Sequence, residues 1–480
     1  MQTAIPTIAI VGGGISGLSA AYFLEKEARA AGRPLQTIVI EREPQLGGKI
    51  ATAQQDGFIF EGGPESFVTR KPEAWELCQE LGLQNRLVGT KNAGKNYVLR
   101  NGRPQIVPTN PIAFAASPLL SGRGKLRLLK EPFVPPRADN GDESLGSFLR
   151  RRIGDEAVDN LAKPAIGAIY LGDVDQMSVQ VSFDRFAQME RENGSLVKGM
   201  FALMKQKKAE RKASGQPREK KPPFATLRGG LMELVDALAA QIEGEIVTGT
   251  AVTALRYNQQ YELVLADGRT LTADVIILAI PTYAMAELLV EHDAHIADQL
   301  GSVIYTPVTT VNVAFNRQDV PNPFDGFGVV IPESEDSQLL AVEGVSVKFP
   351  HRAPDDQFVL RAFVGGQARA GLAALPDDEL IALVLRELAV IFGIEVMPTA
   401  VHITRWQPAN PQPPVGYLAL IAEIEERLQT VLPHLYLTGA GMRGQGIPDC
   451  IRQSRALAEQ VWQAESRSSV SKTSAADFAE

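Results

Sequence analysis

The sequence predicts an α/β fold built around a parallel sheet. Three observations lead to this prediction. A glycine-rich turn joins an apolar strand to a helix near the N-terminus, an acidic residue ends the next apolar strand, and a second glycine-rich turn leads into a helix near the C-terminus. Strand, turn, helix and acid in this order are typical of a dinucleotide-binding βαβ unit.

The N-terminal turn lies between two regular elements. Residues 8–11 form an apolar run typical of a buried parallel strand, and residues 15–24 place apolar side chains at helical spacing. Gly12 allows a tight bend, Gly14 lets the backbone approach a pyrophosphate, and Gly17 lets the helix pack closely on the sheet. The other predicted nucleotide contacts of this turn are Gly13, Ile15 and Ser16. A glycine-rich turn that binds nothing is the alternative.

The second strand and the loops after it extend the predicted site. Residues 37–40 predict a strand that ends on Glu41, where the pattern places a carboxylate on the ribose hydroxyls, with Arg42 beside it. Two more glycine-rich loops follow, at 46–50 and 60–67. An NAD-dependent dehydrogenase does not need these loops. In a flavoprotein, by contrast, the flavin ring of FAD must be held far from the adenosine at the other end of the cofactor. The predicted FAD contacts here are Gly48, Lys49, Gly63, Pro64, Glu65 and Ser66. Surface turns are the alternative for either loop alone.

The C-terminal segment predicts a second side of the same site. Residues 435–438 read as a strand, 439–446 as a turn, and 447–461 as a helix with a proline in its first turn. The N-terminus of that helix would stabilise the negative charge that develops on a flavin as it is reduced. The predicted contacts are Gly439, Ala440, Gly446, Ile447 and Pro448. A second dinucleotide site for NADPH is the alternative, but no strand ending in an acid follows the helix.

The middle of the chain alternates between the predicted domains. An amphipathic helix at 232–242, strands at 246–252 and 261–265, a turn at Asp267-Gly268 and a buried strand at 274–281 are expected to rejoin the cofactor sheet, with Val252 near the adenine. We therefore expect a discontinuous FAD-binding domain of the Rossmann-like, monoamine oxidase type, joined to an α+β substrate domain and a helical insertion. Its boundaries are 1–82, 216–281 and 405–465. The substrate domain takes 83–110 and 282–404, the mainly helical region 111–215, and a disordered tail 466–480.

Composition excludes several classes of protein. The 480 residues are 45% hydrophobic and 22% charged, which suffices for two or three packed lobes. A net charge of −8, without basic residues interleaved with aromatic ones, argues against nucleic acid as a partner. Two cysteines and five scattered histidines predict neither a disulfide framework nor a metal site. We expect a cytoplasmic protein that enters its first strand without a leader.

One region is compatible with contact at a membrane surface. No apolar run reaches the roughly 18 residues that a membrane-spanning helix needs. Residues 111–136, however, mix an apolar run with Arg123, Lys125, Arg127 and Lys130. This mixture is compatible with peripheral attachment to a membrane, while a helix that covers a pocket is the favoured alternative. A homodimer is also compatible with the sequence.

Seven segments together resemble one group of flavoenzymes, the oxygen-dependent porphyrinogen oxidases of haem biosynthesis, within the monoamine oxidase-like FAD superfamily. These enzymes act on protoporphyrinogen or coproporphyrinogen III. The resemblance covers almost the whole chain, and its middle motifs are not shared with amine oxidases or carotenoid desaturases. The segments are 47–50, 61–67, 162–173, 224–231, 348–354, 405–417 and 446–450.

The resemblance implies a reaction and a set of contacts. A porphyrinogen would be oxidised to the porphyrin in three hydride transfers to N5 of a non-covalently bound FAD, with O2 as acceptor and H2O2 as product. No side chain is expected to act as a catalytic base, because cofactor and positioning carry the rate. Gly167 and Ala168 would pass close to the macrocycle, Phe349 would pack on a pyrrole ring, and Trp406 would lie beside the FAD. Core aromatic residues are the alternative for Phe349 and Trp406.

One departure from the family affects the substrate. Many relatives place an arginine, which pairs with a substrate propionate, just before an aromatic-Val-Leu segment; here Asn96 precedes Tyr97. Asn96 cannot form that ion pair, and Lys95 would offer a point charge without a bidentate fork. The sequence thus leaves open whether the substrate carries two propionates or four, and we favour protoporphyrinogen. An amine oxidase or desaturase and a non-catalytic escort protein with a flavoprotein-like fold are the alternative functions.

Overall fold

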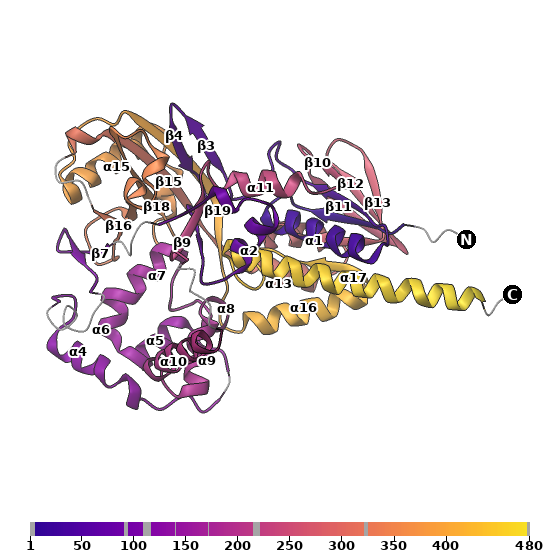
Figure 1. The fold of residues 1–480 in the computed structure, drawn as a ribbon, viewed down its shortest axis with the longest axis horizontal. Coiled ribbons are helices and arrows are strands. Elements are labelled where there is room, and N and C mark those ends of the chain that lie inside the picture. The colour runs from indigo at the N-terminus through magenta and orange to yellow at the C-terminus, as the bar shows by residue number, and fades with distance from the viewer. Residues whose placement is uncertain are drawn as a thin grey trace.

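The computed structural model describes residues 5–90, 95–108, 117–139, 141–170, 172–214, 221–320 and 325–477. The chain forms three parts (Figure 1). A Rossmann-like domain at the right contains both ends of the chain, a large-sheet domain lies at the upper left, and a helical lobe lies below it. This division follows the predicted α/β fold with a helical insertion.

The Rossmann-like domain is built on a five-stranded sheet in the order β10-β2-β1-β14-β20, in which every neighbouring pair is parallel. Its strands are almost wholly apolar and buried, as expected of a parallel sheet with both faces covered. Segments from the start, middle and end of the chain thereby become neighbours. The strands are β1 (Thr7–Val11), β2 (Gln36–Ile40), β10 (Glu245–Val247), β14 (Val275–Leu278) and β20 (Leu435–Leu437).

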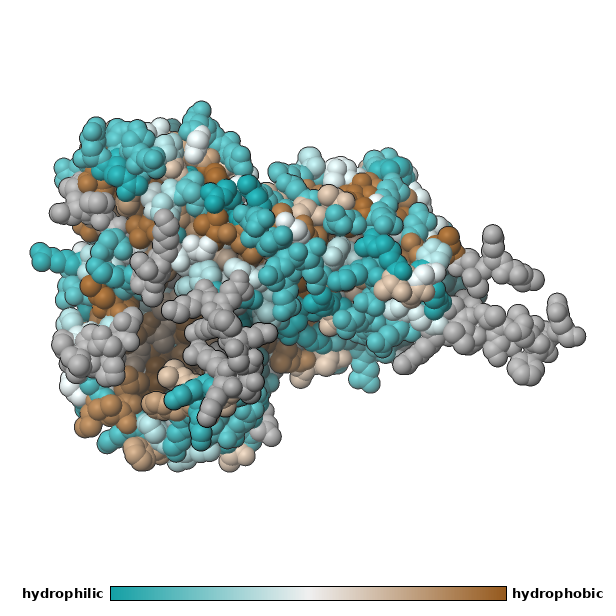
Figure 2. Space-filling model, viewed as in Figure 1, coloured by the Kyte–Doolittle hydropathy of each residue, from teal (hydrophilic) through white to brown (hydrophobic). Residues whose placement is uncertain are grey.

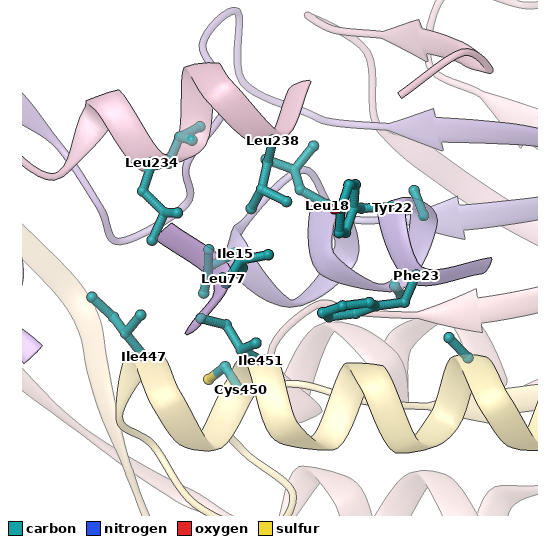
Figure 3. Packing of buried hydrophobic residues seen from close by; sticks show 14 of the residues in the cluster. Ile15, Leu18, Tyr22, Phe23, Leu77, Leu234, Leu238, Ile447, Cys450 and Ile451 are labelled. Carbon is teal, nitrogen blue, oxygen red and sulfur yellow. The ribbon is translucent and has the colours of Figure 1, made fainter. Parts of the chain in front are cut away.

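One face of this sheet is covered by helices from distant parts of the chain. Helix α1 (Ile15–Ala31) packs along α17 (Ile447–Asp477), with α2 (Glu73–Glu80) and α11 (Met232–Ala239) beside them. Figure 3 shows Leu18 and Phe23 of α1 among side chains of these partners. Burial of each large apolar side chain contributes about 1.5–3 kcal/mol. The packing therefore fixes both helix N-termini at the same edge of the sheet.

The opposite face carries a small meander and three helices. The meander pairs antiparallel strands, and its β12–β13 turn is the predicted Asp267-Gly268 turn, with Gly268 at φ 88°. The elements on this face are β11 (Val252–Asn258), β12 (Gln260–Leu265), β13 (Thr270–Ala273), α12 (Thr282–Leu289), α13 (Ala294–Gly301) and α16 (Tyr417–Val431).

The large-sheet domain holds a seven-stranded mixed sheet in the order β19-β15-β18-β17-β16-β7-β8. Helix α15 (Asp377–Phe392) covers one face of it through a buried apolar cluster. The other face is turned toward the Rossmann-like domain. The strands are β7 (Lys95–Arg100), β8 (Arg103–Ile106), β15 (Ile304–Asn316), β16 (Gly326–Val330), β17 (Leu339–Glu343), β18 (Gln357–Gly365) and β19 (Ala400–Gln412).

The helical lobe has a polar centre. Arg152 is fully buried and donates to Glu131 and to the carbonyls of Val134 and Gly194. Glu131 in turn accepts the hydroxyl of Ser195 at the start of α10. The lobe comprises α4 (Gly122–Leu129), η2 (Glu131–Phe133), α5 (Leu145–Ile153), α6 (Asp155–Ala157), the π-helix η3 (Val158–Ala162), α7 (Lys163–Tyr170), α8 (Val179–Ser182), α9 (Asp184–Asn193) and α10 (Leu196–Ser214).

Short strands connect the three parts. β5 (Phe67–Val68), β9 (Phe224–Leu227) and β6 (Leu87–Gly89) form a three-stranded sheet, and β3 (Thr52–Gln55) pairs with β4 (Phe58–Glu61). Within the ranges described above, no helix is long and apolar enough to cross a membrane.

Three predicted boundaries differ from the structure. β19 stays in the large sheet to Gln412, past residue 405, because it pairs with β15 along its length. Residues 282–301 form α12 and α13, which pack on the Rossmann-like domain because their apolar faces complete its core. The predicted disordered tail at 466–480 is helical through Asp477, since α17 meets neither glycine nor proline there; residues 478–480 lie outside the description.

Candidate active site

A cavity of about 2520 Å³ lies where the three parts of the molecule meet. Figure 2 shows a hollow with apolar residues between the helical lobe and the large-sheet domain. Pockets for one drug-sized ligand measure about 300–1,000 Å³. The cavity therefore has room for a dinucleotide and a second molecule together.

The N-terminal turn at one end of this cavity has the geometry that its glycines predict. A Cβ on Gly12, which has φ 111°, would lie 2.7 Å from the carbonyl oxygen of Ala279, and one on Gly17 would lie 1.9 Å from that of Gly12. Only glycine fits at these two positions. Gly14 lines the cavity, and a Cβ there would meet no atom closer than 3.7 Å. Ile15 and Ser16 also line it, so the N-terminus of α1 is open to an anion.

Glu41 lies at the end of β2, where the dinucleotide pattern requires an acid. It is buried, lines the cavity, and accepts hydrogen bonds from the backbone amides of Gly13 at 2.7 Å and Glu43 at 2.9 Å. Gly13 therefore holds the carboxylate rather than lining the wall. Each carboxylate oxygen keeps a lone pair for a ribose hydroxyl. Val252 and Arg42 line the same end, and Arg42 pairs with Glu43.

Lys49 is a half-buried cation in the wall of the cavity. Gly48, which precedes it, packs against Gly14. The Lys49 ammonium lies 5.5 Å from the centre of the Tyr305 ring, and no carboxylate within the ranges given above pairs with it. Burial lowers the pKa of Lys49 to about 8. An anionic group bound beside it would restore the charged form.

The loop at 61–66 lines the cavity, and side chains of the large-sheet domain hold it by hydrogen bonds. Arg361 of β18 donates to the carbonyls of Gly62 at 2.9 Å and Gly63 at 2.6 Å. Trp406 of β19 donates its indole N–H to Gly62 at 2.9 Å. Arg352 donates to the carbonyl of Glu65 at 3.1 Å. The residues of the loop that line the cavity include Gly63, Pro64, Glu65 and Ser66.

These arginines belong to what we call the buried charge network, which has three cations and three carboxylates: Arg352, Arg361, Lys348, Glu61, Glu65 and Glu343. Arg352 Nη1 lies 3.0 Å from Glu61 Oε1 and forms an ion pair with it, although the geometry is not that of a hydrogen bond. Both side chains are fully buried. Arg361 lies 3.4 Å from Glu65. Lys348 pairs with Glu343. Burial raises the pKa of Glu61, which Arg352 opposes.

The C-terminal turn lines the same cavity as the N-terminal one. Gly439 has φ 130°, and a Cβ on Gly441 would lie 2.6 Å from the hydroxyl oxygen of Tyr305. Lys71 binds both carboxylate oxygens of Asp449 at 2.6 Å, in the first turn of α17. Residues of this turn that line the cavity include Gly439, Ala440, Gly446, Ile447 and Pro448.

The residues predicted to bind the substrate agree less well with the lining of the cavity than those predicted to bind the cofactor. Asn96 lines the cavity, but Lys95 pairs with Asp325 and does not. Gly167 lies in α7 and is not among the residues that line the cavity, whereas Leu161 and Ala165, earlier in the lobe, line it; the side chain of Ala168 lies outside the described residues. The π-helix that precedes Pro164 shifts the helix face, and no sequence pattern had indicated it.

Phe349 does not reach the cavity, contrary to our expectation. Its side chain is fully buried beneath Arg352, whose guanidinium lies 5.3 Å from the ring centre. The alternative of a core aromatic residue is the one that the structure supports. The neighbouring Lys348 lines the cavity instead.

Sequence reasoning missed Arg352 and Arg361, the two buried arginines of this site. Arg361 stands inside an otherwise apolar strand, 358–364, which is a detectable signal, because a charged side chain in a buried strand must have partners. Arg352 lies in a motif that we had used only for the resemblance. Their shared role became visible only when the large sheet was placed against the loop at 61–66.

The site defines a class of protein, the oxidoreductases that bind a flavin dinucleotide. Two helix N-termini, a buried acid at the end of β2 and two glycine loops fit an extended anionic dinucleotide, and the cavity continues beyond them. No group of three metal-ligating side chains occurs among the residues described.

Comparison with known proteins agrees with this class. The model of the flavin-containing amine oxidoreductase family matches residues 15–462, and the chain belongs to this family. It is 37% identical to the coproporphyrinogen III oxidase of Bacillus subtilis over 94% of this chain and 96% of that one. It is 28% identical to protoporphyrinogen oxidase 2 of Arabidopsis thaliana, over 95% and 93%. A crystal structure from Exiguobacterium sp. 255-15, provisionally named a protoporphyrinogen oxidase, matches with a TM-score of 0.84 and 30% identity, over 96% and 100%.

Proposed function

We propose that the protein is an FAD-dependent, oxygen-linked oxidase that converts a porphyrinogen of haem biosynthesis into the porphyrin. The observation that carries the proposal is a cavity with a complete dinucleotide end and a second compartment that reaches the large sheet and the helical lobe. The full-length relatives named for porphyrinogen oxidation give the substrate class.

FAD would be held without a covalent bond. Gly12, Gly14 and Glu41 would bind its adenosine diphosphate part, and the loop at 61–66 with the first turn of α17 would hold the flavin. Cys450 is the one cysteine in the cavity wall, and its thiol is fully protonated because burial raises its pKa to about 11. A protonated, buried thiol does not attack a flavin. Acid precipitation of the holoenzyme should release all the flavin into the supernatant, whereas flavin retained on the protein would contradict this part.

When bound, FAD supplies the acceptor for hydride in each of three rounds, and O2 then reoxidises it to give H2O2. The chain supplies position and a dry site. Trp406 and Arg361 fix the loop at 61–66. Apolar side chains such as Phe183, Phe327 and Val329 line the wall and exclude water. The overall reaction is porphyrinogen and three O2 giving porphyrin and three H2O2.

We favour coproporphyrinogen III over protoporphyrinogen as the substrate, although the sequence had favoured the latter. The relative named for coproporphyrinogen III is 37% identical, and the plant protoporphyrinogen oxidase is 28% identical. The choice is also supported by Arg70 and Lys221, two basic residues in the wall of the cavity.

Anaerobic mixing tests the function. FAD-loaded protein mixed with coproporphyrinogen III should lose its flavin absorbance, and admission of air should yield three H2O2 per porphyrin formed. Purified protein without a flavin band would support an escort protein instead. Peroxide formed from a panel of amines, with no bleaching by either porphyrinogen, would support an amine oxidase.

The proposal extends to peripheral membrane contact by the helical lobe. Leu129 of α4 is 72% exposed and Phe133 of η2 is 84% exposed, with Arg123 and Lys130 exposed beside them. Large apolar side chains ringed by cations suit an anionic lipid surface. Residues 109–116, part of the segment that predicted this contact, lie outside the described residues. Co-sedimentation with phosphatidylglycerol vesicles, lost in Phe133→Asp, tests it.

A further inference from the structure

Three cations lie in the wall of the cavity, and we call them the cationic rim: Arg70, Lys71 and Lys221. All three line the cavity. Asp449 pairs with Lys71, which leaves Arg70 and Lys221 without a carboxylate partner among the residues described. Arg70 is exposed and Lys221 is half-buried. The rim therefore keeps two uncompensated positive charges.

Strand pairing fixes the two unpaired cations near each other. β5 pairs with β9 at Val68 and Phe224, and the Thr69 amide donates to the Pro223 carbonyl at 3.1 Å. The Thr69 hydroxyl donates to the carbonyl of Pro222. Arg70 and Lys221 are the next residues on these two segments. Their backbones are thus held side by side before any ligand arrives.

The rim also has a defined relation to the rest of the cavity. The Lys221 ammonium lies 5.0 Å from the Trp75 ring centre, which steadies its long side chain. Phe224 continues the wall from the rim, and the Lys348 ammonium of the large-sheet domain lies 5.6 Å from its ring. Phe224 thus links the rim to the part of the cavity wall that the large-sheet domain contributes.

We propose that Arg70 and Lys221 bind carboxylates at the outer edge of the substrate and so select a macrocycle with four carboxylates over one with two. The inference rests on the proposed function. It assigns to Arg70 and Lys221 the ion pairs with substrate carboxylates that Asn96 cannot form. Arg70 offers a planar fork to a carboxylate, and Lys221 adds a point charge. A substrate with carboxylates on every pyrrole ring presents some to the rim in any orientation, whereas a substrate with carboxylates on two rings has to turn them toward it.

The test compares coproporphyrinogen III with protoporphyrinogen in Arg70→Ala, Lys221→Ala and the double variant. Loss of a charge-assisted contact worth about 1.5 kcal/mol raises KM about tenfold. We expect KM for coproporphyrinogen III to rise by up to about that factor in each single variant and by more in the double variant, which removes both contacts, with kcat changed less than twofold. The preference in kcat/KM for coproporphyrinogen III over protoporphyrinogen should shrink. Arg70→Lys should retain more affinity than Arg70→Ala.

Two controls keep the result interpretable. Arg123→Ala removes an exposed cation of α4 and should leave both KM values unchanged. Raised salt should weaken kcat/KM of the wild-type protein and affect the double variant less. Bleaching by neither porphyrinogen in the wild-type protein refutes the proposed function. Normal bleaching with an unchanged substrate preference in the folded, flavin-loaded double variant refutes the role of the rim alone.

Discussion

The cavity has two charged regions that differ in almost every respect. The buried charge network has three cations and three carboxylates, and Arg352 and Glu61 within it are fully buried. The cationic rim has three cations and one carboxylate, and its Lys71 side chain is 41% exposed. Paired charges without solvent fix geometry, because they cannot move without losing their partners. Unbalanced charges in solvent are available to a ligand. The contrast assigns the first region to the cofactor loop and the second to the substrate.

The largest expected effect comes from breaking the buried charge network. Arg352→Met leaves Glu61 without a cation and Glu65 with Arg361 alone, and breaking a buried pair costs about 3–5 kcal/mol. We expect urea unfolding of the apoprotein to show a loss of this size, and weaker FAD binding. Lys95→Met is the matched control, since it breaks an exposed pair worth at most about 1 kcal/mol. Equal losses in the two variants would contradict the distinction between buried and exposed pairs.

The next largest effect is the contribution of Lys49 to the pH dependence of the free energy of unfolding. Its pKa falls from 10.5 unfolded to about 8 folded, because burial disfavours the charge. A lysine with a lowered pKa contributes stability above the unfolded pKa, and this stability is lost as pH falls through the folded pKa. The apoprotein should therefore gain, from this group, about 3 kcal/mol between pH 8 and 10.5. The difference in unfolding free energy between wild type and Lys49→Met measures this contribution, and a difference independent of pH would contradict it.

Binding of FAD should reverse this shift. An anionic group beside Lys49 favours the ammonium, so the protein should take up a fraction of a proton on binding FAD near pH 8. Calorimetric titration in buffers of different ionisation enthalpy measures the uptake. Lys49→Met should abolish it, while Lys221→Met, a change in the cationic rim, should leave it unchanged.

The smallest effect concerns Trp406. Trp406→Phe keeps an aromatic ring but removes the N–H that holds Gly62. A single neutral hydrogen bond contributes about 1 kcal/mol, which corresponds to roughly a fivefold rise in the Kd for FAD. Fluorescence titration of the apoprotein checks the value. A rise of a hundredfold or more would show that the indole does more than fix the loop.

Sequence reasoning predicted the arrangement of those cavity residues that depend on the local backbone. Gly12, Gly14, Gly17 and Glu41 lie within one βαβ unit, so their spacing alone predicts their arrangement. The helix that begins at Ile447 could be predicted for the same reason. The apolar character of the strands near the two ends of the chain was enough to predict that both ends belong to one sheet.

Sequence reasoning failed for residues that come together only when separate parts of the chain pack against one another. Phe349 was assigned to the substrate by resemblance, but Arg352 and the neighbouring core bury it. Arg70 and Lys221 lie about 150 residues apart and meet only because β5 pairs with β9. No pattern within either segment encodes that pairing. Side chains that line the cavity from different lobes are therefore the least predictable from sequence.

The most direct test of the central claim is the anaerobic reaction of FAD-loaded protein with coproporphyrinogen III. The proposed function predicts that one equivalent of flavin is bleached for each two electrons transferred, and that coproporphyrin III accumulates when O2 is admitted. Flavin that stays oxidised in the presence of excess coproporphyrinogen III and of excess protoporphyrinogen would contradict it.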